Sequence, residues 1–187
     1  MTNASSLQSL DLSNNQLAFD LKEMRLPPGI SSVQLRSNRI TGSLSAILNN
    51  SSSKISFLEV LDVSMNMISG AIPDSVTGLT RLKRLDIARN RVSGSLPASL
   101  GKLADLQWID VSVNLLTGKI PSSLLTVKNL RHANFRANRL CGEIPQGRPY
   151  NIFPASTYAH NLCLCGKPLP LFRGRESRYE PAIVLPR

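Results

Sequence analysis

The chain has 187 residues, of which 42% are hydrophobic, and a formal net charge of +10. This length suits one compact domain or a short repeat array, and the hydrophobic content argues against wholesale disorder. No apolar run approaches the roughly 20 residues of a membrane-spanning helix. The first residues lack the basic stretch and following apolar stretch of a signal peptide.

The positive charge is concentrated in the C-terminal part of the chain. Residues 1–80 hold 5 basic and 6 acidic side chains, whereas residues 81–187 hold 17 basic and 6 acidic side chains. An anionic partner is therefore conceivable for the C-terminal part. Aromatic residues make up only 5% of the chain, and no nucleic-acid motif is present, so we expect no nucleic-acid partner.

A repeat that begins at Leu7 organises most of the chain. In chain order, its copies place asparagines 23, 28, 24, 24 and 24 residues apart. These asparagines are Asn15, Asn38, Asn66, Asn90, Asn114 and Asn138. Each is the asparagine of the pattern L-x-x-L-x-L-x-x-N-x-L, which is typical of leucine-rich repeats.

Each copy predicts a short strand that leads into a turn. Leu61 and Val63 alternate with Asp62, so the aliphatic side chains point to one face of the strand and Asp62 to the other. Six such strands in parallel would bury a continuous core that no single repeat could bury. The asparagine amide offers donors and an acceptor to the backbone of the turn. The pattern predicts an α/β repeat solenoid with a parallel concave β-sheet.

The rest of each copy predicts the convex side. A glycine follows four residues after most of the asparagines, and aliphatic–proline pairs such as Ile72-Pro73 and Leu96-Pro97 come next. Glycine permits a positive-φ turn, and proline ends ladder pairing. Beyond the prolines, apolar residues recur at every third or fourth position, which favours short 3₁₀ segments and loops over long α-helices.

The signature N-x-[LIV]-[ST]-G-x-[IL]-P resembles the plant-specific class of leucine-rich repeats. That class includes receptor-like kinases, receptor-like proteins and polygalacturonase-inhibiting proteins, and the resemblance implies a right-handed superhelix. We assign residues 1–145 to six repeats, 146–170 to a C-terminal cap and 171–187 to an unstructured basic tail. Ala18-Phe19 and Ser45 depart from the signature, so the convex turns of the first two copies are expected to differ.

The segment from Cys141 to Pro170 resembles the C-terminal cap of polygalacturonase-inhibiting proteins. In that family the four cap cysteines pair first with second and third with fourth, which implies a Cys141–Cys163 disulfide. Phe172 occupies the place of the fourth cysteine, so Cys165 is expected to be unpaired. Three reduced thiols in a cytosolic protein are the alternative. No cysteine-paired cap precedes the first copy, and the resemblance therefore implies an N-terminally truncated family member.

The resemblance also implies an extracellular location, at the cell wall or plasma-membrane surface. Because no signal peptide is recognisable, a cytosolic truncated form is the alternative. Three sequons, at Asn3, Asn49 and Asn50, are candidate glycosylation sites if the chain enters the secretory pathway. Asn49 and Asn50 lie in the polar insertion that lengthens the second spacing.

We find no catalytic or metal-binding constellation, and we expect no enzyme activity, metal or cofactor. The candidate binding residues are instead the outward positions of repeats 4 to 6. They are Lys83, Arg84, Asp86, Arg89, Gln107, Trp108, Asp110, Arg131, His132, Asn134 and Arg136. A tryptophan between basic residues is typical of an interface anchor. Each residue singly also fits a solvated position on a half-buried sheet.

These features predict a non-catalytic module of a plant extracellular recognition or defence protein that binds a protein or peptide through its concave sheet. Two alternatives stay open. The chain could bind acidic pectin as a cell-wall protein, or it could be the ectodomain fragment of a receptor-like kinase in signalling. The transmembrane helix and kinase of such a receptor would lie outside this chain, which has no transmembrane segment.

Overall fold

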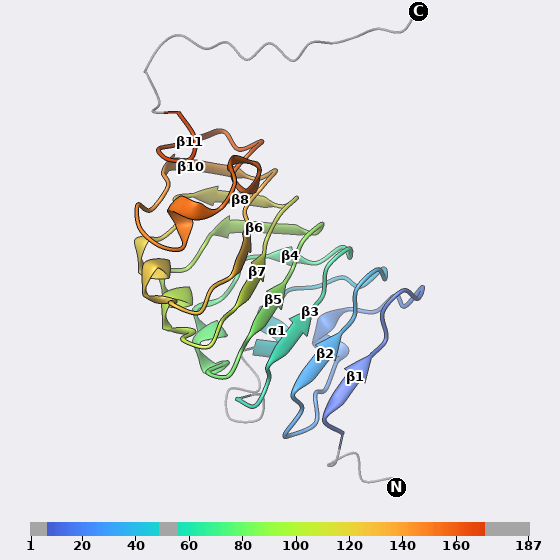
Figure 1. The fold of residues 1–187 in the computed structure, drawn as a ribbon. Helices are drawn as coiled ribbons and strands as arrows, with labels where there is room; N and C mark the ends of the chain where they lie inside the picture. Colours follow the sequence, from blue (N-terminus) through green and yellow to red (C-terminus); the bar gives the residue numbers. More distant parts are fainter. Residues whose placement is uncertain (1–6, 49–55, 171–187) are drawn as a thin grey trace, which may run out of the picture.

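A computed structural model describes residues 7–48 and 56–170, and it shows the predicted stack of repeats (Figure 1). Six parallel strands form one sheet in chain order. They are β1 (Ser9–Asp11), β2 (Ser32–Gln34), β3 (Val60–Asp62), β5 (Arg84–Asp86), β7 (Trp108–Asp110) and β9 (His132–Asn134). Equivalent residues of successive repeats are in register, as where Leu61 pairs with Leu85. The leucine-rich-repeat solenoid is confirmed.

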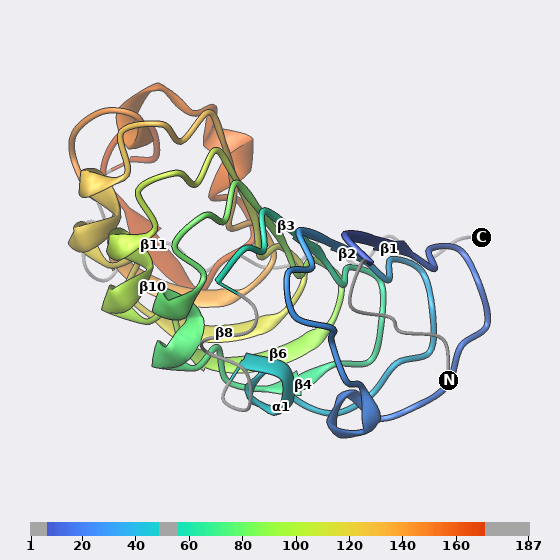
Figure 2. The same ribbon diagram turned by 90° about the horizontal axis from the view of Figure 1, so that it is seen from below.

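A second parallel sheet, which the repeat pattern did not indicate, lies on a different side of the coil (Figure 2). It contains β4 (Ser69–Gly70), β6 (Arg91–Ser95), β8 (Leu115–Gly118), β10 (Arg139–Glu143) and β11 (Cys163–Cys165). These strands cover the [ST]-G part of the signature, where we expected only turns. Gly94 does have a positive φ of 77°, yet it pairs with Leu116. Stacking brings the [ST]-G segments of neighbouring repeats within backbone hydrogen-bonding distance of each other, so short strands form there as well.

Short helices occupy the remaining side of the coil. Four of them are 3₁₀ segments: η2 (Leu21–Glu23), η3 (Asp74–Gly78), η4 (Ala98–Lys102) and η5 (Ser122–Thr126). The apolar spacing predicts η3, η4 and η5, whereas η2 belongs to the first copy, whose convex turn was expected to differ. Pro73, Pro97 and Pro121 stand directly before the last three of these. The second copy has α1 (Ser45–Leu48) instead. There Ser45 replaces the proline, and the segment closes one α-helical turn over buried Ile47 and Leu48.

The interior is a continuous stack of aliphatic side chains. Leu61, Leu85 and Ile109 occupy equivalent positions of neighbouring strands, and each is at most 1% exposed. Leu10 in β1 is only partly buried against the same core. Repeats on both sides cover an internal leucine, whereas among the described strands β1 has a neighbour only in β2. Full burial of one such side chain contributes about 1.5–3 kcal/mol, so the core depends on stacking.

The C-terminal end is covered by η6 (Tyr150–Ile152), η7 (Ala155–Thr157) and β11. Tyr158 is 1% exposed, stacks on Phe135 with ring centroids 5.9 Å apart, and donates its hydroxyl to the Tyr150 carbonyl at 2.9 Å. The Phe135 amide donates to the Thr157 carbonyl at 2.9 Å. This segment thus covers the apolar end of the last repeat and supplies hydrogen-bond partners to its backbone. The predicted tail, 171–187, and the sequons at Asn3, Asn49 and Asn50 lie outside the described residues.

Candidate functional site

The outward face of the first sheet consists of two side-chain columns. The register places Arg84, Trp108 and His132 side by side on β5, β7 and β9. Two residues further along each strand, a polar column runs across the whole sheet. Its members are Asp11, Gln34, Asp62, Asp86, Asp110 and Asn134. The structure therefore brings most of the candidate residues of repeats 4 to 6 onto one surface.

Trp108 lies between a cation and an imidazole. The guanidinium carbon of Arg84 is 4.4 Å from the centroid of the Trp108 ring. On the other side, the ring of His132 stacks on Trp108 with centroids 3.5 Å apart and an interplanar angle of 12°. Cation–π attraction and ring stacking both fix the indole in place. The stack thus holds a large half-buried aromatic surface rigid on the sheet.

Two ring nitrogens in this stack are buried without a hydrogen-bond partner among the described residues, namely Trp108 Nε1 and His132 Nε2. Unsatisfied buried donors are uncommon in native proteins and call for an explanation. Burial, and secondarily the positive charge of Arg84, lower the pKa of His132, while Asp110 opposes this shift. This shift favours the neutral imidazole, in which one ring nitrogen is a hydrogen-bond donor and the other an acceptor.

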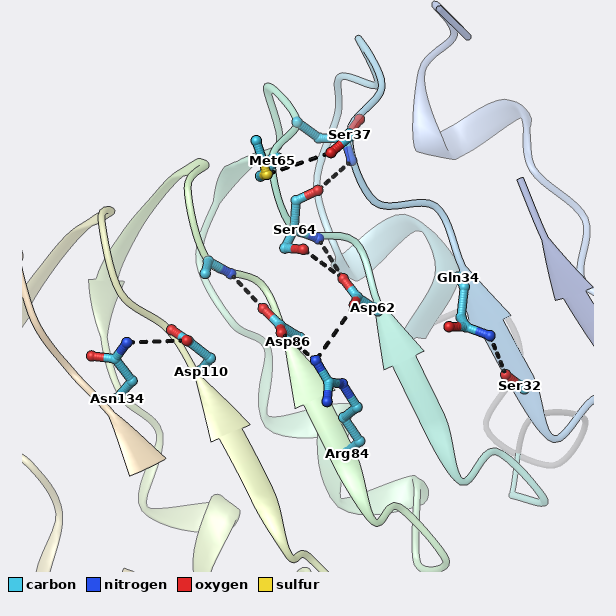
Figure 3. A network of polar contacts seen from close by, with 12 residues as sticks. Ser32, Gln34, Ser37, Asp62, Ser64, Met65, Arg84, Asp86, Asp110 and Asn134 are labelled. Atoms are coloured by element: carbon cyan, nitrogen blue, oxygen red, sulfur yellow. Dashed lines mark hydrogen bonds and ion pairs between the residues drawn. The ribbon is translucent and has the colours of Figure 1, made fainter. Parts of the chain in front are cut away.

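Carboxylates surround the head group of Arg84, as Figure 3 shows. Its Nη2 lies 2.9 Å from Asp86 Oδ2 and 3.7 Å from Asp62 Oδ2. We expected Asp86 to be an outward, solvated residue, but it is only 5% exposed. Burial and the neighbouring charges of Asp62 and Asp110 raise the pKa of Asp86 to about 6, against the opposing effects of the Ala88 amide and Arg84. Asp86 therefore positions Arg84 and is not itself available to a partner.

The remaining candidates differ in availability. Lys83 is exposed but pairs with Glu59 at 2.7 Å. Arg131 and Arg136 are exposed and border an open cavity of about 340 Å³ between β9 and the cap. The wall of this cavity also includes His132, Asn134, Phe153, Pro154 and Thr157. Gln107 is exposed at the start of β7, and Asn134 donates to Asp110 Oδ2 at 3.1 Å. Arg89 lies outside the sheet, in the turn beyond β5.

The asparagine ladder is built from bonds between repeats. Asn114 Nδ2 donates to the carbonyls of Val111 and Ser112 in its own repeat and of Ile87 in the preceding one, at 3.0–3.2 Å. Its Oδ1 accepts from the Val92 amide at 2.9 Å. Asn38, Asn66, Asn90 and Asn138 repeat this arrangement.

The two ends of the ladder differ from the prediction. Asn15 is exposed, and among the described residues it donates only to the Leu12 and Ser13 carbonyls of its own repeat. Asn161, which we did not assign to the ladder, donates to the Phe135 carbonyl and accepts from the Leu140 amide. Its spacing of 23 residues from Asn138 was the available signal. The cap therefore continues the ladder beyond the sixth repeat.

A disulfide joins Cys141 to Cys163, with the sulfur atoms 2.01 Å apart. It links the paired strands β10 and β11. Cys165 is a half-buried free thiol. Among the described residues no cluster of His, Cys, Asp or Glu could hold a metal ion, and no helix there is long and apolar enough to cross a membrane.

Comparison with known proteins agrees with this architecture. Two family models described as leucine-rich repeat match residues 56–116 and 6–33. No curated protein sequence matches the chain. Among solved structures, a chain of the BIR3–SERK2 complex from Arabidopsis thaliana is 31% identical at a TM-score of 0.69, with 79% of this chain and 76% of that chain covered.

Two other similar structures, both from Arabidopsis thaliana, are much longer than this chain, which matches only a part of each. The ectodomain of the receptor kinase GASSHO1/SCHENGEN3, in complex with CASPARIAN STRIP INTEGRITY FACTOR 2, is 30% identical at a TM-score of 0.73, over 90% of this chain and 23% of that one. The ectodomain of the receptor kinase HAESA, in complex with an extended IDA peptide hormone, is 28% identical at 0.72, over 87% and 26%. This chain spans about a quarter of their length. The chain belongs to the plant-type leucine-rich-repeat proteins and is similar to the ectodomains of plant receptors.

Proposed function

We propose that this protein is a non-catalytic, extracellular recognition module that binds a peptide or protein through the concave face of repeats 4 to 6. The carrying observation is the stack of Arg84, Trp108 and His132 on that face. All three side chains are half-buried, so part of the stack stays accessible to a bound ligand. Rigid aromatic and arginine anchors of this kind dominate the energetics of protein interfaces.

Three further observations support a peptide or protein ligand. The carboxylates Asp62 and Asp86 hold Arg84 in place, so little side-chain entropy is lost when a ligand contacts it. The cavity at Arg131 and Arg136 continues the surface towards the cap and could accept one ligand side chain. Finally, two of the similar structures are of the receptor kinase HAESA in complex with the peptide hormone IDA.

Trp108 makes this proposal directly measurable, because it is the single tryptophan of the chain. Candidate peptides and extracellular proteins would first be selected on the immobilised protein. Each would then be titrated against the intrinsic fluorescence of Trp108. A ligand on the concave face should change this emission. Isothermal titration calorimetry would compare the variants, because Trp108→Ala has no tryptophan to report binding. Trp108→Ala and Arg84→Ala should each weaken binding by at least about tenfold, as expected for interface anchors.

Arg81 provides a matched control for Arg84. Its guanidinium also lies over an aromatic ring, that of Phe57, at 4.9 Å from the centroid, but outside the strand columns. Arg81→Ala should therefore leave affinity within about twofold, a change of under 1 kcal/mol. If ligands bind with unchanged Trp108 emission, or Arg81→Ala weakens binding as much as Arg84→Ala, the concave face is not the binding surface.

A further inference from the structure

The turns that follow the strands of the first sheet carry a surface of their own, outside the strand columns. In each turn the asparagine amide bonds to backbone groups. The residues directly before the asparagines form one column along the stack of repeats, and the residues directly after them form a second. We call these two columns together the turn ridge. The column before the asparagines is Asn14, Ser37, Met65, Arg89, Val113, Ala137 and His160, and the column after them is Gln16, Arg39, Met67, Arg91, Leu115, Arg139 and Leu162.

The backbone holds the turn ridge in a fixed shape. All seven residues of the first column have a positive φ between 55° and 59°. Their amides bond from repeat to repeat: Met65 donates to Ala88 and Arg89 donates to Ser112, both at 2.8 Å, and Val113 donates to Arg136 at 2.9 Å. Figure 3 shows one bond of this ladder, in which the Ser37 amide donates to the Ser64 carbonyl at 3.0 Å. The side chains therefore project from a backbone tied to both neighbours.

The chemistry of the second column alternates. From the second repeat onwards its residues are Arg39, Met67, Arg91, Leu115, Arg139 and Leu162, so a cation and an apolar side chain take turns. Leu115 is 40% exposed and Leu162 is 72% exposed. In the neighbouring column, Met65 and Val113 are exposed to a similar extent as Leu115.

The charge of the turn ridge is uncompensated. Neither column contains an aspartate or glutamate. Within residues 7–48 and 56–170, none of the arginines of the ridge takes part in an ion pair. Free cations beside exposed aliphatic side chains are suited to a partner that supplies both carboxylates and apolar contacts.

We propose that the turn ridge docks an extended protein segment that carries carboxylates and aliphatic side chains. Adjacent repeats are about 4.8 Å apart, so arginines two repeats apart are separated by about 10 Å. A polyproline II segment returns to the same side every three residues, or about 9 Å. A carboxylate at every third position would therefore meet Arg39, Arg91 and Arg139 in turn. Aliphatic residues between the carboxylates would cover Met67 and Leu115. A pectin chain carries carboxylates but has no aliphatic side chains that could make these contacts.

The test uses a fluorescent peptide of roughly twelve residues in the polyproline II register, with glutamate at every third position and leucine and proline between. Its binding to the intact protein is followed by anisotropy. Replacing Arg39, Arg91 and Arg139 together by glutamine should raise Kd about tenfold, since exposed ion pairs contribute modestly and add up. The matched control replaces Lys22, Lys102 and Lys128 by glutamine, which changes the net charge equally and should alter Kd less than about twofold.

Two further measurements distinguish docking on the turn ridge from binding elsewhere on the protein. Leu115→Ser with Leu162→Ser should raise Kd about fivefold, because apolar burial is lost. Saturating peptide should leave Trp108 emission unchanged, which keeps this outcome independent of the concave-face proposal. The docking proposal is overturned if the lysine control weakens binding as much as the arginine variant, if the leucine variant binds normally, if polygalacturonate binds the ridge more tightly than the peptide, or if Trp108→Ala abolishes binding.

Discussion

Replacing Asn114 by alanine would test whether the asparagine ladder holds the repeats together. Asn114 is 7% exposed and bonds to two repeats. Without its amide, the buried Val92 amide loses its acceptor, whereas the Ile87 and Val111 carbonyls keep bonds from Asn90 and Asn138.

The magnitude follows from this uneven loss. One buried unsatisfied amide costs about 1–3 kcal/mol, and the lost carbonyl bonds add about 1 kcal/mol. We therefore expect Asn114→Ala to destabilise the protein by about 2–4 kcal/mol. For a chain of this size, that lowers Tm by about 5–12 °C.

Asn15 is the matched control, because it has the same repeat position but, within residues 7–48 and 56–170, bonds only inside its own repeat. Asn15→Ala should cost less than about 1 kcal/mol. Thermal and urea unfolding followed by far-UV circular dichroism would measure both variants. Equal losses for Asn15→Ala and Asn114→Ala, or a loss below about 1 kcal/mol for Asn114→Ala, would refute the view that bonds between repeats carry the stability.

Two further predictions concern packing and charge. Because the native pKa of Asp86 is raised from 3.8 to about 6, its charge opposes folding at neutral pH, and this cost grows as pH rises from about 4 to about 6. Asp86→Asn should therefore be more stable than wild type by about 1–2 kcal/mol at pH 7, after allowance for the lost pairing with Arg84. Urea unfolding should show this difference in stability closing near pH 4. A difference that does not change with pH would contradict the raised pKa of Asp86. A Cβ on Gly101 would come within 2.7 Å of the Ser123 carbonyl carbon in the next repeat, so Gly101→Ala should cost about 1–3 kcal/mol in thermal unfolding. The neighbouring exposed Lys102→Ala should cost little, and equal losses for the two variants would rule out a steric cause.

Much of the fold could be predicted because the aliphatic pattern determines both strand and register. Leu61 and Leu85 occupy the same position of successive repeats, 24 residues apart, and for this reason they are buried partners on neighbouring strands. The second sheet could not be predicted in this way, because Ser93-Gly94 has the local chemistry of a turn and gains strand pairing only from the neighbouring repeat. Asn161 was missed since Tyr158 takes the place of the expected aliphatic residue.

The candidate site was predictable in position but not in detail. Spacing alone places Trp108 and His132 on adjacent strands. Their ring stacking, however, depends on side-chain rotamers that no spacing reports. The burial of Asp86 likewise arises from the crowding of Asp62, Arg84 and Asp110 around it, and this crowding is a property of the assembled sheet. The sequence therefore placed the candidate residues on one surface, while the structure shows which of them are buried or paired, such as Asp86 and Lys83.

The asparagine ladder also bears on how such an array changes in length. Each internal asparagine bonds to backbone atoms, so it needs only another copy before it, whatever the side chains of that copy. Deleting or duplicating one complete unit of 24 residues would restore the same bonds across the new junction and leave no buried group orphaned. The protein is in this sense modular, and its concave sheet can be lengthened or shortened in whole repeats.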